Sequence, residues 1–293
     1  MQLKDVLAQG IGLLERASID SPRMTAEVLL MHAVQCERAH LHAHPERELT
    51  SNELVNFGKY LNERTKGRPT QYITGHQEFW GMDFLVNPSV LIPRPETEMV
   101  VETAIAIARG CSVVCGTPRI ADVGTGSGCI AVALAHELPE ARIFALDRSR
   151  EALDVARQNA ARHGVDTRIA FLESDLLLCS PADALPPVEM VVSNPPYLAE
   201  KDRFAIQREV REFEPSYAIF AGRAGDEIYL RLIPQAADRM RSGGYLVLEL
   251  GFDSEKAVRD LLGPPDWDAV YTKSDLAGIN RVITAWRVPV ESQ

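Results

Sequence analysis

The sequence predicts an α/β protein with a seven-stranded, doubly wound sheet whose last strand is antiparallel, preceded by a small helical domain and a β-hairpin linker. From about residue 118, β-rich apolar segments alternate with helical segments, a pattern typical of a parallel doubly wound sheet. Before residue 72, apolar residues recur only at helical spacing. The predicted domains are therefore a helical domain at 1–72, a hairpin linker at 73–92 and a sheet domain at 93–293.

The helical domain contains two clear amphipathic segments. Residues 24–35 follow Ser21-Pro22, a dipeptide that is typical of a helix start. Residues 51–67 form the second segment, and Ser51 can cap its first turn. No alternating pattern of the kind that predicts a strand occurs here.

A hairpin and a long helix follow the helical domain. Aromatic and β-branched residues surround Gly81, which predicts a hairpin between 73 and 92. Prolines then precede a long amphipathic helix at 93–108, and Glu96 or Thr97 can serve its first turn.

The sheet domain shows seven segments with strand character. Helical patterns at 128–138, 150–164 and 226–240 lie between them. Only residues 273–280 separate the last two strands, which is too short for a helical crossover, so these strands should pair antiparallel. This arrangement resembles the class I methyltransferase fold. The predicted strands are 119–124, 142–147, 168–174, 188–194, 244–251, 267–272 and 281–288.

Charge and composition exclude several classes of protein. The net charge of −10 and the pI of about 5.3 argue against a large non-specific nucleic-acid surface, so no stable nucleic-acid partner is expected. No apolar run approaches the ~18 residues of a membrane span, and the first residues lack a signal-peptide pattern. We therefore expect a cytoplasmic protein without a membrane partner, and a monomer by default.

Neither cysteines nor histidines predict a disulfide framework or a metal site. The cysteines are odd in number and scattered, and no paired C-x-x-C motif is present. The segment at 40–44, His-Leu-His-Ala-His, has no acidic or cysteine partner at ligand spacing and is more typical of a solvated helix end. The cysteines are Cys36, Cys111, Cys115, Cys129 and Cys179.

A glycine-rich loop follows the first predicted strand. It departs from the dinucleotide-binding pattern G-x-G-x-x-G, because its third glycine falls one residue early and Cys129 occupies the expected place. A G-x-G-x-G loop preceded by Asp122 resembles the S-adenosylmethionine loop of class I methyltransferases. Taken alone, the loop could equally be a tight strand-to-helix turn, and Asp122 could hold its backbone amides. The loop residues are Gly124, Thr125, Gly126, Ser127 and Gly128.

The next two strand ends also carry acidic residues. Asp147 ends the second strand, where a carboxylate can accept hydrogen bonds from ribose hydroxyls. Asp175 ends the third strand, near the expected adenine position. Because parallel strands end at one sheet edge, these groups should meet in one crevice. An acidic rim suits a cationic sulfonium, so S-adenosylmethionine is the expected cofactor and S-adenosylhomocysteine its product.

The fourth strand ends in Asn194, Pro195, Pro196 and Tyr197. Two prolines make a stiff loop and remove two backbone donors. Asn194 Oδ1 and the Pro195 carbonyl can accept hydrogen bonds from the NH2 group of a planar acceptor. Tyr197 can pack on the plane of that acceptor. A rigid connection without chemistry is the alternative for the tetrapeptide alone. Transfer of a methyl group from an already activated sulfonium to such an NH2 group needs neither a strong base nor a metal.

Four motifs occur in order and carry a family resemblance. They are "LIPRPETE" at 91–98, "DVGTGSG" at 122–128, "SNPPY" at 193–197 and "FEP" at 213–215. With the helical first domain, they resemble the HemK/PrmC family of release factor glutamine methyltransferases over about residues 5–288. The resemblance implies methyl transfer to the side-chain N5 of glutamine in the Gly-Gly-Gln loop of class I peptide chain release factors.

The resemblance also implies roles for individual residues. The loop from Gly124 to Gly128, with Asp147 and Asn194, would contact the cofactor, and residues 194–197 would hold the glutamine. The family often has an aromatic residue that packs on the adenine, where this chain has Leu176. We expect the helical domain to recognise the body of the release factor.

Other functions remain open from the sequence. The same tetrapeptide occurs in methyltransferases that modify exocyclic amines of adenine or guanine. Such an enzyme would need a basic surface to bind nucleic acid. A non-catalytic binding protein would be expected to have a damaged glycine loop or tetrapeptide, and both are intact here. Arg94 could bridge to Glu96, contact substrate or cofactor, or only shape the helix entry. The charged segment at 201–215 could be a lid, a partner surface or a solvated helix face.

Overall fold

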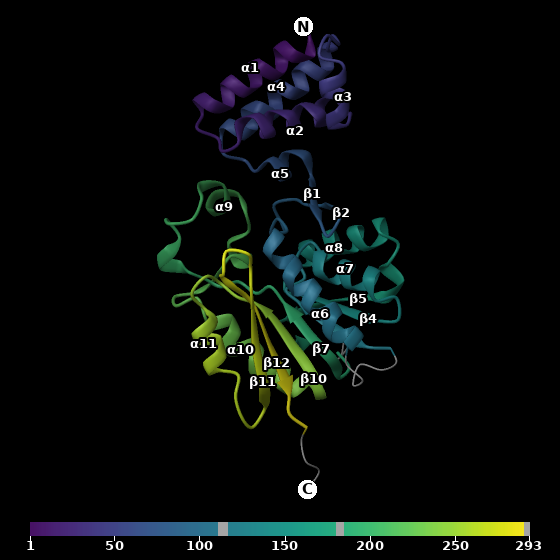
Figure 1. The fold of residues 1–293 in the computed structure, drawn as a ribbon, viewed down its shortest axis with the longest axis vertical. Helices are drawn as coiled ribbons and strands as arrows, with labels where there is room; N and C mark the ends of the chain where they lie inside the picture. Colours follow the sequence, from purple (N-terminus) through teal and green to yellow (C-terminus); the bar gives the residue numbers. More distant parts are fainter. Residues whose placement is uncertain (111–116, 180–184, 290–293) are drawn as a thin grey trace. The chain divides into compact units, whose positions relative to one another are not determined.

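The computed structural model describes residues 1–110, 117–179 and 185–289 (Figure 1). Cys111 and Cys115 lie outside these residues. The chain forms two compact units, and the predicted division at 72 and 92 stays a prediction. The first unit contains residues 1–76 and 207–213, and the second contains 77–206 and 214–293.

The first unit is helical and includes a segment from the second half of the sequence. Its helices pack around a core that contains Leu14, Leu29, Leu30 and Phe57. Arg64 has a nearly buried side chain, whose Nη2 lies 2.7 Å from Glu209 Oε2 in α9. The helices are α1 (Leu3–Arg16), α2 (Pro22–Val34), α3 (Arg38–Ala43), α4 (Ser51–Thr65), α5 (Thr70–Thr74) and α9 (Arg208–Phe213).

The N-terminal cap of α4 differs from the predicted one. Ser51 is the first helical residue, and Thr50 is the cap. Thr50 Oγ1 accepts a hydrogen bond from the Glu53 N–H at 3.3 Å, and Glu53 Oε2 accepts one from the Thr50 N–H at 2.8 Å. This reciprocal capping box satisfies two backbone donors at once, which a cap at Ser51 could not do with Glu53.

The second unit begins with the hairpin that the sequence predicts. Strands β1 (His76–Phe79) and β2 (Met82–Leu85) pair in a two-stranded sheet. Trp80 and Gly81 form the turn, with φ values of 55° and 69°. The Trp80 N–H donates to Glu98 Oε1 at 2.8 Å, which anchors the turn to the following long helix.

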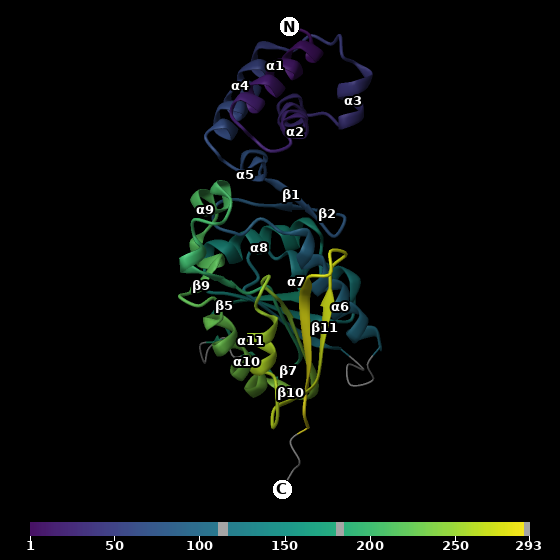
Figure 2. The same ribbon diagram turned by 60° about the vertical axis from the view of Figure 1, so that its left-hand side comes forward.

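A large mixed sheet forms the centre of the second unit, and its strand order confirms the predicted fold (Figures 1 and 2). The order is β11-β12-β10-β7-β3-β4-β5-β6, and β12 runs antiparallel to both β10 and β11. A short antiparallel edge strand, β6, was not predicted. The strands are β3 (Arg119–Val123), β4 (Arg142–Asp147), β5 (Ile169–Asp175), β6 (Leu178–Cys179), β7 (Val188–Ser193), β10 (Met240–Glu249), β11 (Trp267–Ser274) and β12 (Asn280–Arg287).

Helices cover both faces of this sheet, and neighbouring strand residues point to opposite faces. Ile120 packs in one core with α6, α7 and α8, whereas Ala121 packs in a second core with α10 and α11. Burial on both faces explains why the parallel strands are almost continuously apolar. The helices are α6 (Glu98–Gly110), α7 (Cys129–Glu137), α8 (Arg150–Arg162), α10 (Glu227–Arg239) and α11 (Glu255–Asp260).

Short elements complete the second unit. They are η1 (Pro95–Thr97), η3 (Asp166–Arg168), β8 (Leu198–Ala199), η5 (Glu200–Asp202), η6 (Ser216–Ala218) and β9 (Phe220–Gly222). Two of them, η1 and η6, supply side chains to the cavity described next.

Candidate active site

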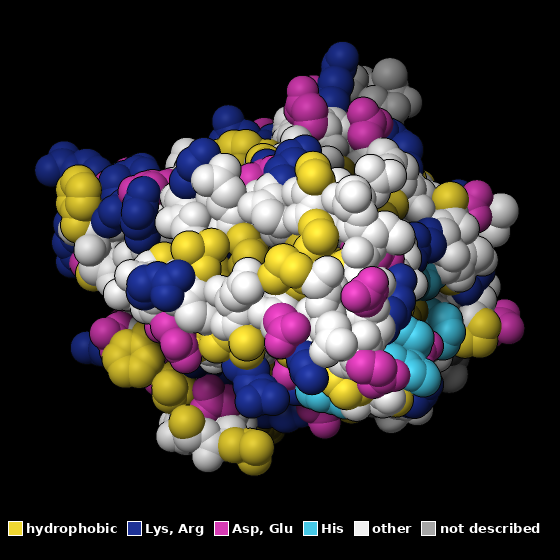
Figure 3. Space-filling model, turned by 90° about the horizontal axis from the view of Figure 1, so that it is seen from above, with side chains coloured by type: hydrophobic (Ala, Val, Ile, Leu, Met, Phe, Trp, Pro, Cys, Tyr) yellow, Lys and Arg dark blue, Asp and Glu magenta, His cyan; other side chains and the backbone are white. Residues whose placement is uncertain are grey.

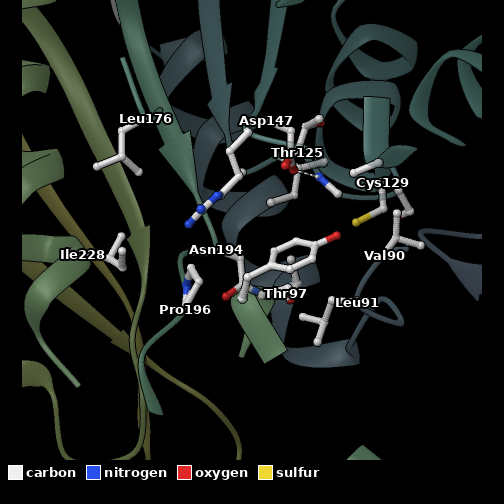
Figure 4. Close-up of a pocket in the computed structure, with 18 of the residues that line it drawn as sticks. Val90, Leu91, Thr97, Thr125, Cys129, Asp147, Leu176, Asn194, Pro196 and Ile228 are labelled. Carbon is white, nitrogen blue, oxygen red and sulfur yellow. Dashed lines mark hydrogen bonds between the residues drawn. The ribbon is translucent and has the colours of Figure 1, made fainter. Parts of the chain in front are cut away.

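A cavity lies at the carboxyl edge of the sheet, where β3, β4, β5 and β7 end (Figure 4). Leu176 and Ile228 lie on one side of it, and Val90, Leu91 and Cys129 lie on the other. The lining residues predicted from the sequence are Gly124, Thr125, Gly126, Ser127, Asp147, Asp175, Leu176, Asn194 and Pro196. A single crevice therefore joins the ends of four strands, as expected for this topology.

The glycine loop takes a backbone conformation that few other residues adopt. Gly124, Gly126 and Gly128 have φ values of 73°, 54° and 81°. A Cβ at Gly128 would lie 3.0 Å from Ala156 Cβ in α8, so this glycine also permits close packing. The first two N–H groups of the loop, at Gly124 and Thr125, both donate to the Leu146 carbonyl.

Asp122 is fully buried beneath the loop. Its Oδ2 accepts hydrogen bonds from Thr125 Oγ1 at 2.6 Å and from the Ala131 N–H at 3.1 Å. Burial raises the pKa of this carboxyl to about 7, and the neighbouring charge of Asp147 adds to the effect. Its Oδ1 is buried without a hydrogen-bond partner among the residues described. Asp122 therefore braces the loop and keeps one acceptor unused.

Asp147 ends β4 and ties the loop to the start of α8. Its Oδ2 accepts a hydrogen bond from the Gly126 N–H and its Oδ1 one from the Ser149 N–H, both at 2.9 Å. Burial raises the pKa of Asp147, whereas these backbone donors lower it in part. Asp147 lines the cavity, and its predicted contact with ribose hydroxyls stays a prediction.

Asp175 and Leu176 follow β5 on the far wall of the cavity. Arg231 Nη2 from α10 lies 2.5 Å from Asp175 Oδ2. This ion pair leaves Asp175 Oδ1 for another partner. Leu176 has a φ of 57°, which is uncommon for a leucine and costs conformational energy. Its side chain supplies apolar surface to the wall.

The tetrapeptide after β7 divides between the cavity and the core. Asn194 and Pro196 line the cavity, whereas Pro195 is buried. The ring of Tyr197 packs on Gly251, where a Cβ would lie 2.7 Å from its Cδ2. Tyr197 is not among the lining residues of the described cavity, and its predicted contact with the acceptor stays a prediction.

Arg94 has a partner that the sequence did not suggest. Its Nη2 lies 2.5 Å from Glu214 Oε1, and the Ile92 N–H donates to Glu214 Oε2 at 3.1 Å. Glu214 belongs to the "FEP" motif and is buried. It therefore connects two of the separated motifs and positions the segment that carries Arg94 at the cavity wall.

The sequence did not indicate a role at the cavity for three residues, Thr97, Glu249 and Tyr217. Thr97 and Tyr217 line the cavity, and Thr97 bonds to both Asn194 and Glu249. Tyr217 Oη donates to the Ser89 carbonyl at 2.8 Å. Thr97 stands within the "LIPRPETE" motif, but Glu249 lies 152 positions further along the chain and has no local signal.

Within residues 1–110, 117–179 and 185–289, no three His, Cys, Asp or Glu side chains are grouped so that they could hold a metal ion. In the same segments, no helix is both long and apolar enough to cross a bilayer.

The strand order, the glycine loop and the cavity together define a class I methyltransferase. The sequence profile of the methyltransferase small domain matches residues 114–212, and that of the PrmC N-terminal domain matches residues 5–75. A methyltransferase from Pyrococcus furiosus superposes with a TM-score of 0.50 at 17% identity, over 72% of this chain and 91% of the other. The hMettl16 catalytic domain gives 0.55 at 18% identity, over 80% and 84%. These likenesses show the fold.

Sequence relatives identify the family. The "Release factor glutamine methyltransferase" of Koribacter versatilis is 43% identical over 97% of this chain and 98% of the relative. Those of Chlorobaculum tepidum and Moorella thermoacetica are 46% identical over 88% of both chains, and 41% identical over 98% of this chain and 99% of the relative. The chain belongs to the release factor glutamine methyltransferase family.

Proposed function

We propose that this protein transfers a methyl group from S-adenosylmethionine to the side-chain N5 of the glutamine in the Gly-Gly-Gln motif of class I peptide chain release factors. The observation that carries the proposal is near full-length identity of 43% to a relative named "Release factor glutamine methyltransferase". The intact Asn-Pro-Pro-Tyr sequence at the cavity supports it. We expect the protein to act as a monomer in the cytoplasm, with its helical unit recognising the factor.

The cavity residues fit this cofactor. Among the described residues, Asp122 Oδ1 beneath the loop is buried without a hydrogen-bond partner, and Asp147 lies on the cavity wall. Negative groups of this kind favour a cationic sulfonium. Residues 124–128, with Asp147, Asp175, Leu176 and Asn194, would hold the group. When bound, S-adenosylmethionine would supply an activated methyl group and leave as S-adenosylhomocysteine, and the methylated nitrogen would then lose one proton.

The residues of the chain orient the acceptor. Asn194 Oδ1 and the Pro195 carbonyl would accept hydrogen bonds from the two N–H groups of the glutamine amide. This arrangement fixes the nitrogen and moves electron density toward it. Proximity and orientation of this kind can lower a barrier by several kcal/mol, with ~7–11 kcal/mol as an upper range. Tyr197 would cover the acceptor and exclude water.

Methylation of an exocyclic amine in nucleic acid is the competing activity. On the face drawn in Figure 3, basic and acidic side chains are interspersed. A surface for nucleic acid needs a concentrated basic patch, and the chain carries a net charge of −10. These observations favour a protein acceptor.

The test uses methyl-labelled S-adenosylmethionine with a purified release factor, its loop Gln-to-Ala variant, DNA and ribosomal RNA. We expect label only on the intact factor, and we expect Asn194→Ala to remove it. Label on nucleic acid and none on the factor would replace the proposed function with the competing one.

A further inference from the structure

A short chain of hydrogen bonds leads from the tetrapeptide to a buried carboxylate (Figure 4 shows its first two members). Asn194 Nδ2 donates to Thr97 Oγ1 at 3.0 Å, and Thr97 Oγ1 lies 2.7 Å from Glu249 Oε2. Thr97 and Glu249 are each only 2% exposed. The three residues come from η1 and from the ends of β7 and β10, so the fold alone brings them together.

The chemistry of these groups fixes the direction of the hydrogen bonds. An ionised carboxylate can only accept, and a threonine hydroxyl has a single proton. When Glu249 is ionised, the Thr97 proton is therefore committed to Glu249. Thr97 can then only accept from Asn194, so the amide must turn its NH2 toward Thr97 and its Oδ1 away from it. Among the residues described, no donor bonds to Asn194 Oδ1.

We propose that Thr97 and ionised Glu249 are positioning residues for methyl transfer, because they hold the Asn194 amide with Oδ1 available to the acceptor nitrogen. This inference rests on the proposed function, since it takes an NH2-bearing acceptor. Without the chain of bonds, the amide can rotate by half a turn. It would then present NH2 to the NH2 of the acceptor, and two donors cannot bond to each other.

Protonation of Glu249 provides a readout that a purely structural role would lack. A neutral carboxyl can donate to Thr97, which releases the Thr97 proton to bond with Asn194 Oδ1 and hold the amide in the wrong orientation. Burial raises the pKa of Glu249 to about 7, and the Thr97 hydrogen bond lowers it in part. We therefore expect methyl transfer to weaken as pH falls below about 7.

Several other groups act electrostatically on Glu249. Glu96 raises its pKa, whereas Arg281 of β12 and Arg94 lower it. Its charge also acts on Tyr197 in the loop after β7, Tyr229 of α10 and Cys129 of α7. Asp122 also has a pKa raised to about 7, so cofactor must be saturating to separate its titration from that of Glu249.

The experiment measures the single-turnover rate of methyl transfer to intact release factor, with enzyme in excess and cofactor saturating. Thr97→Val and Glu249→Gln should each lower the rate by about 10²-fold, the loss typical of one preorganised hydrogen-bonding group. Thr97→Ser keeps the hydroxyl and should stay within about 3-fold of wild type. The wild-type rate should rise between about pH 6 and about pH 8, and Glu249→Gln should remove that rise.

Two matched variants control for the loss of a polar group that does not line the cavity. Glu189→Gln alters a buried carboxylate at the opposite end of β7, where Arg119 pairs with it at 2.9 Å. Thr103→Val removes the hydroxyl of a half-buried residue in α6 that donates to the Met99 carbonyl at 2.7 Å. Both should keep the wild-type rate per folded molecule, with folding checked by thermal unfolding.

Equal losses in these controls and in the Thr97 and Glu249 variants would overturn the inference. A wild-type rate that is flat with pH would also overturn it, and this measurement does not depend on any variant folding. If wild type labels nucleic acid instead of release factor, the proposed function fails. The same variant ratios, measured on that acceptor, still decide the role of Thr97 and Glu249.

Discussion

One buried carboxylate of the helical unit and two of the second unit have opposite kinds of partner. Two further buried carboxylates of the second unit, Glu189 and Glu214, have arginine partners. In the helical unit, Glu27 of α2 has a side chain that is 2% exposed and pairs with Arg23 at 3.2 Å and Arg38 at 2.7 Å. Burial alone would raise the pKa of Glu27. Hydrogen bonds from Arg38 and Arg23 outweigh burial and hold the pKa below its usual value.

In the second unit, Asp122 and Glu249 are buried but contact neutral donors. Asp122 bonds to the Thr125 hydroxyl and the Ala131 N–H, and Glu249 bonds to the Thr97 hydroxyl. Within the described residues, no lysine or arginine lies within 4.0 Å of either carboxylate. Burial consequently raises both pKa values to about 7.

From this difference we infer that Glu27 stabilises the fold, whereas Asp122 and Glu249 act at the candidate active site. An arginine partner neutralises a buried acid and removes its field from the surroundings. An acid held only by hydroxyl and N–H groups keeps its charge available for a cationic ligand or an oriented neighbour, at a cost in folding free energy.

The largest expected effect comes from neutralising the acid beneath the glycine loop. Asp122→Asn should weaken S-adenosylmethionine binding by about 10²-fold, because a buried negative charge near a cationic ligand is lost. Isothermal titration calorimetry gives the dissociation constant. Unchanged affinity together with a lowered melting temperature would show that Asp122 stabilises the fold and has no role in cofactor binding. The contrast with Glu27 would then be wrong.

The matching change in the helical unit should affect stability and not binding. Glu27→Gln should lower the free energy of unfolding by about 1–3 kcal/mol, since charge-assisted hydrogen bonds from two arginines are weakened. Thermal unfolding followed by circular dichroism measures the loss, and calorimetry should return the wild-type cofactor affinity. A weakened affinity in this variant would contradict the division between fold and site.

The pH dependence of stability should have opposite signs for the two acids. The raised pKa of Asp122 means that the folded state binds the extra proton between about pH 4 and about pH 7, so its contribution to stability falls as pH rises. The melting temperature of Asp122→Asn, relative to wild type, should therefore increase from about pH 4 to about pH 7.

For Glu27 the same reasoning gives the reverse. Its lowered pKa stabilises the fold above the unfolded value, and this contribution is lost as pH falls through the folded pKa. The deficit of Glu27→Gln should therefore shrink on acidification toward about pH 4. Parallel pH trends in the two variants would show that the contrast in pairing has no energetic consequence.

The smallest expected effect concerns the apolar wall of the cavity. Leu176→Phe should tighten cofactor binding by about 0.5–1.5 kcal/mol, because an aromatic ring can stack on the adenine. Leu178→Phe, at an exposed position that does not line the cavity, is the matched control. Weaker binding in Leu176→Phe alone would indicate that the positive φ of this residue, 57°, does not tolerate the ring.

Local pattern was sufficient to predict most of the fold. The strand predicted at 142–147 is β4 (Arg142–Asp147), and the short connection at 273–280 led to the antiparallel pairing that β12 shows. The capping box Thr50-x-x-Glu53 was also present in the sequence, although Ser51 was chosen as the cap. Such features depend on neighbours a few residues apart, which a linear pattern records directly.

By itself, the sequence determined the alternation of strands and helices, the antiparallel pairing of the last two strands, and the residues of the glycine loop and tetrapeptide. Each of these depends on short-range periodicity, a short connection or a contiguous motif. Only the tertiary structure decided how Asn194, Thr97 and Glu249 meet, that Glu214 reaches Arg94, and that residues 207–213 join the helical unit. Contacts between groups as many as 152 positions apart depend on how the elements pack, and no local spacing in the chain encodes them.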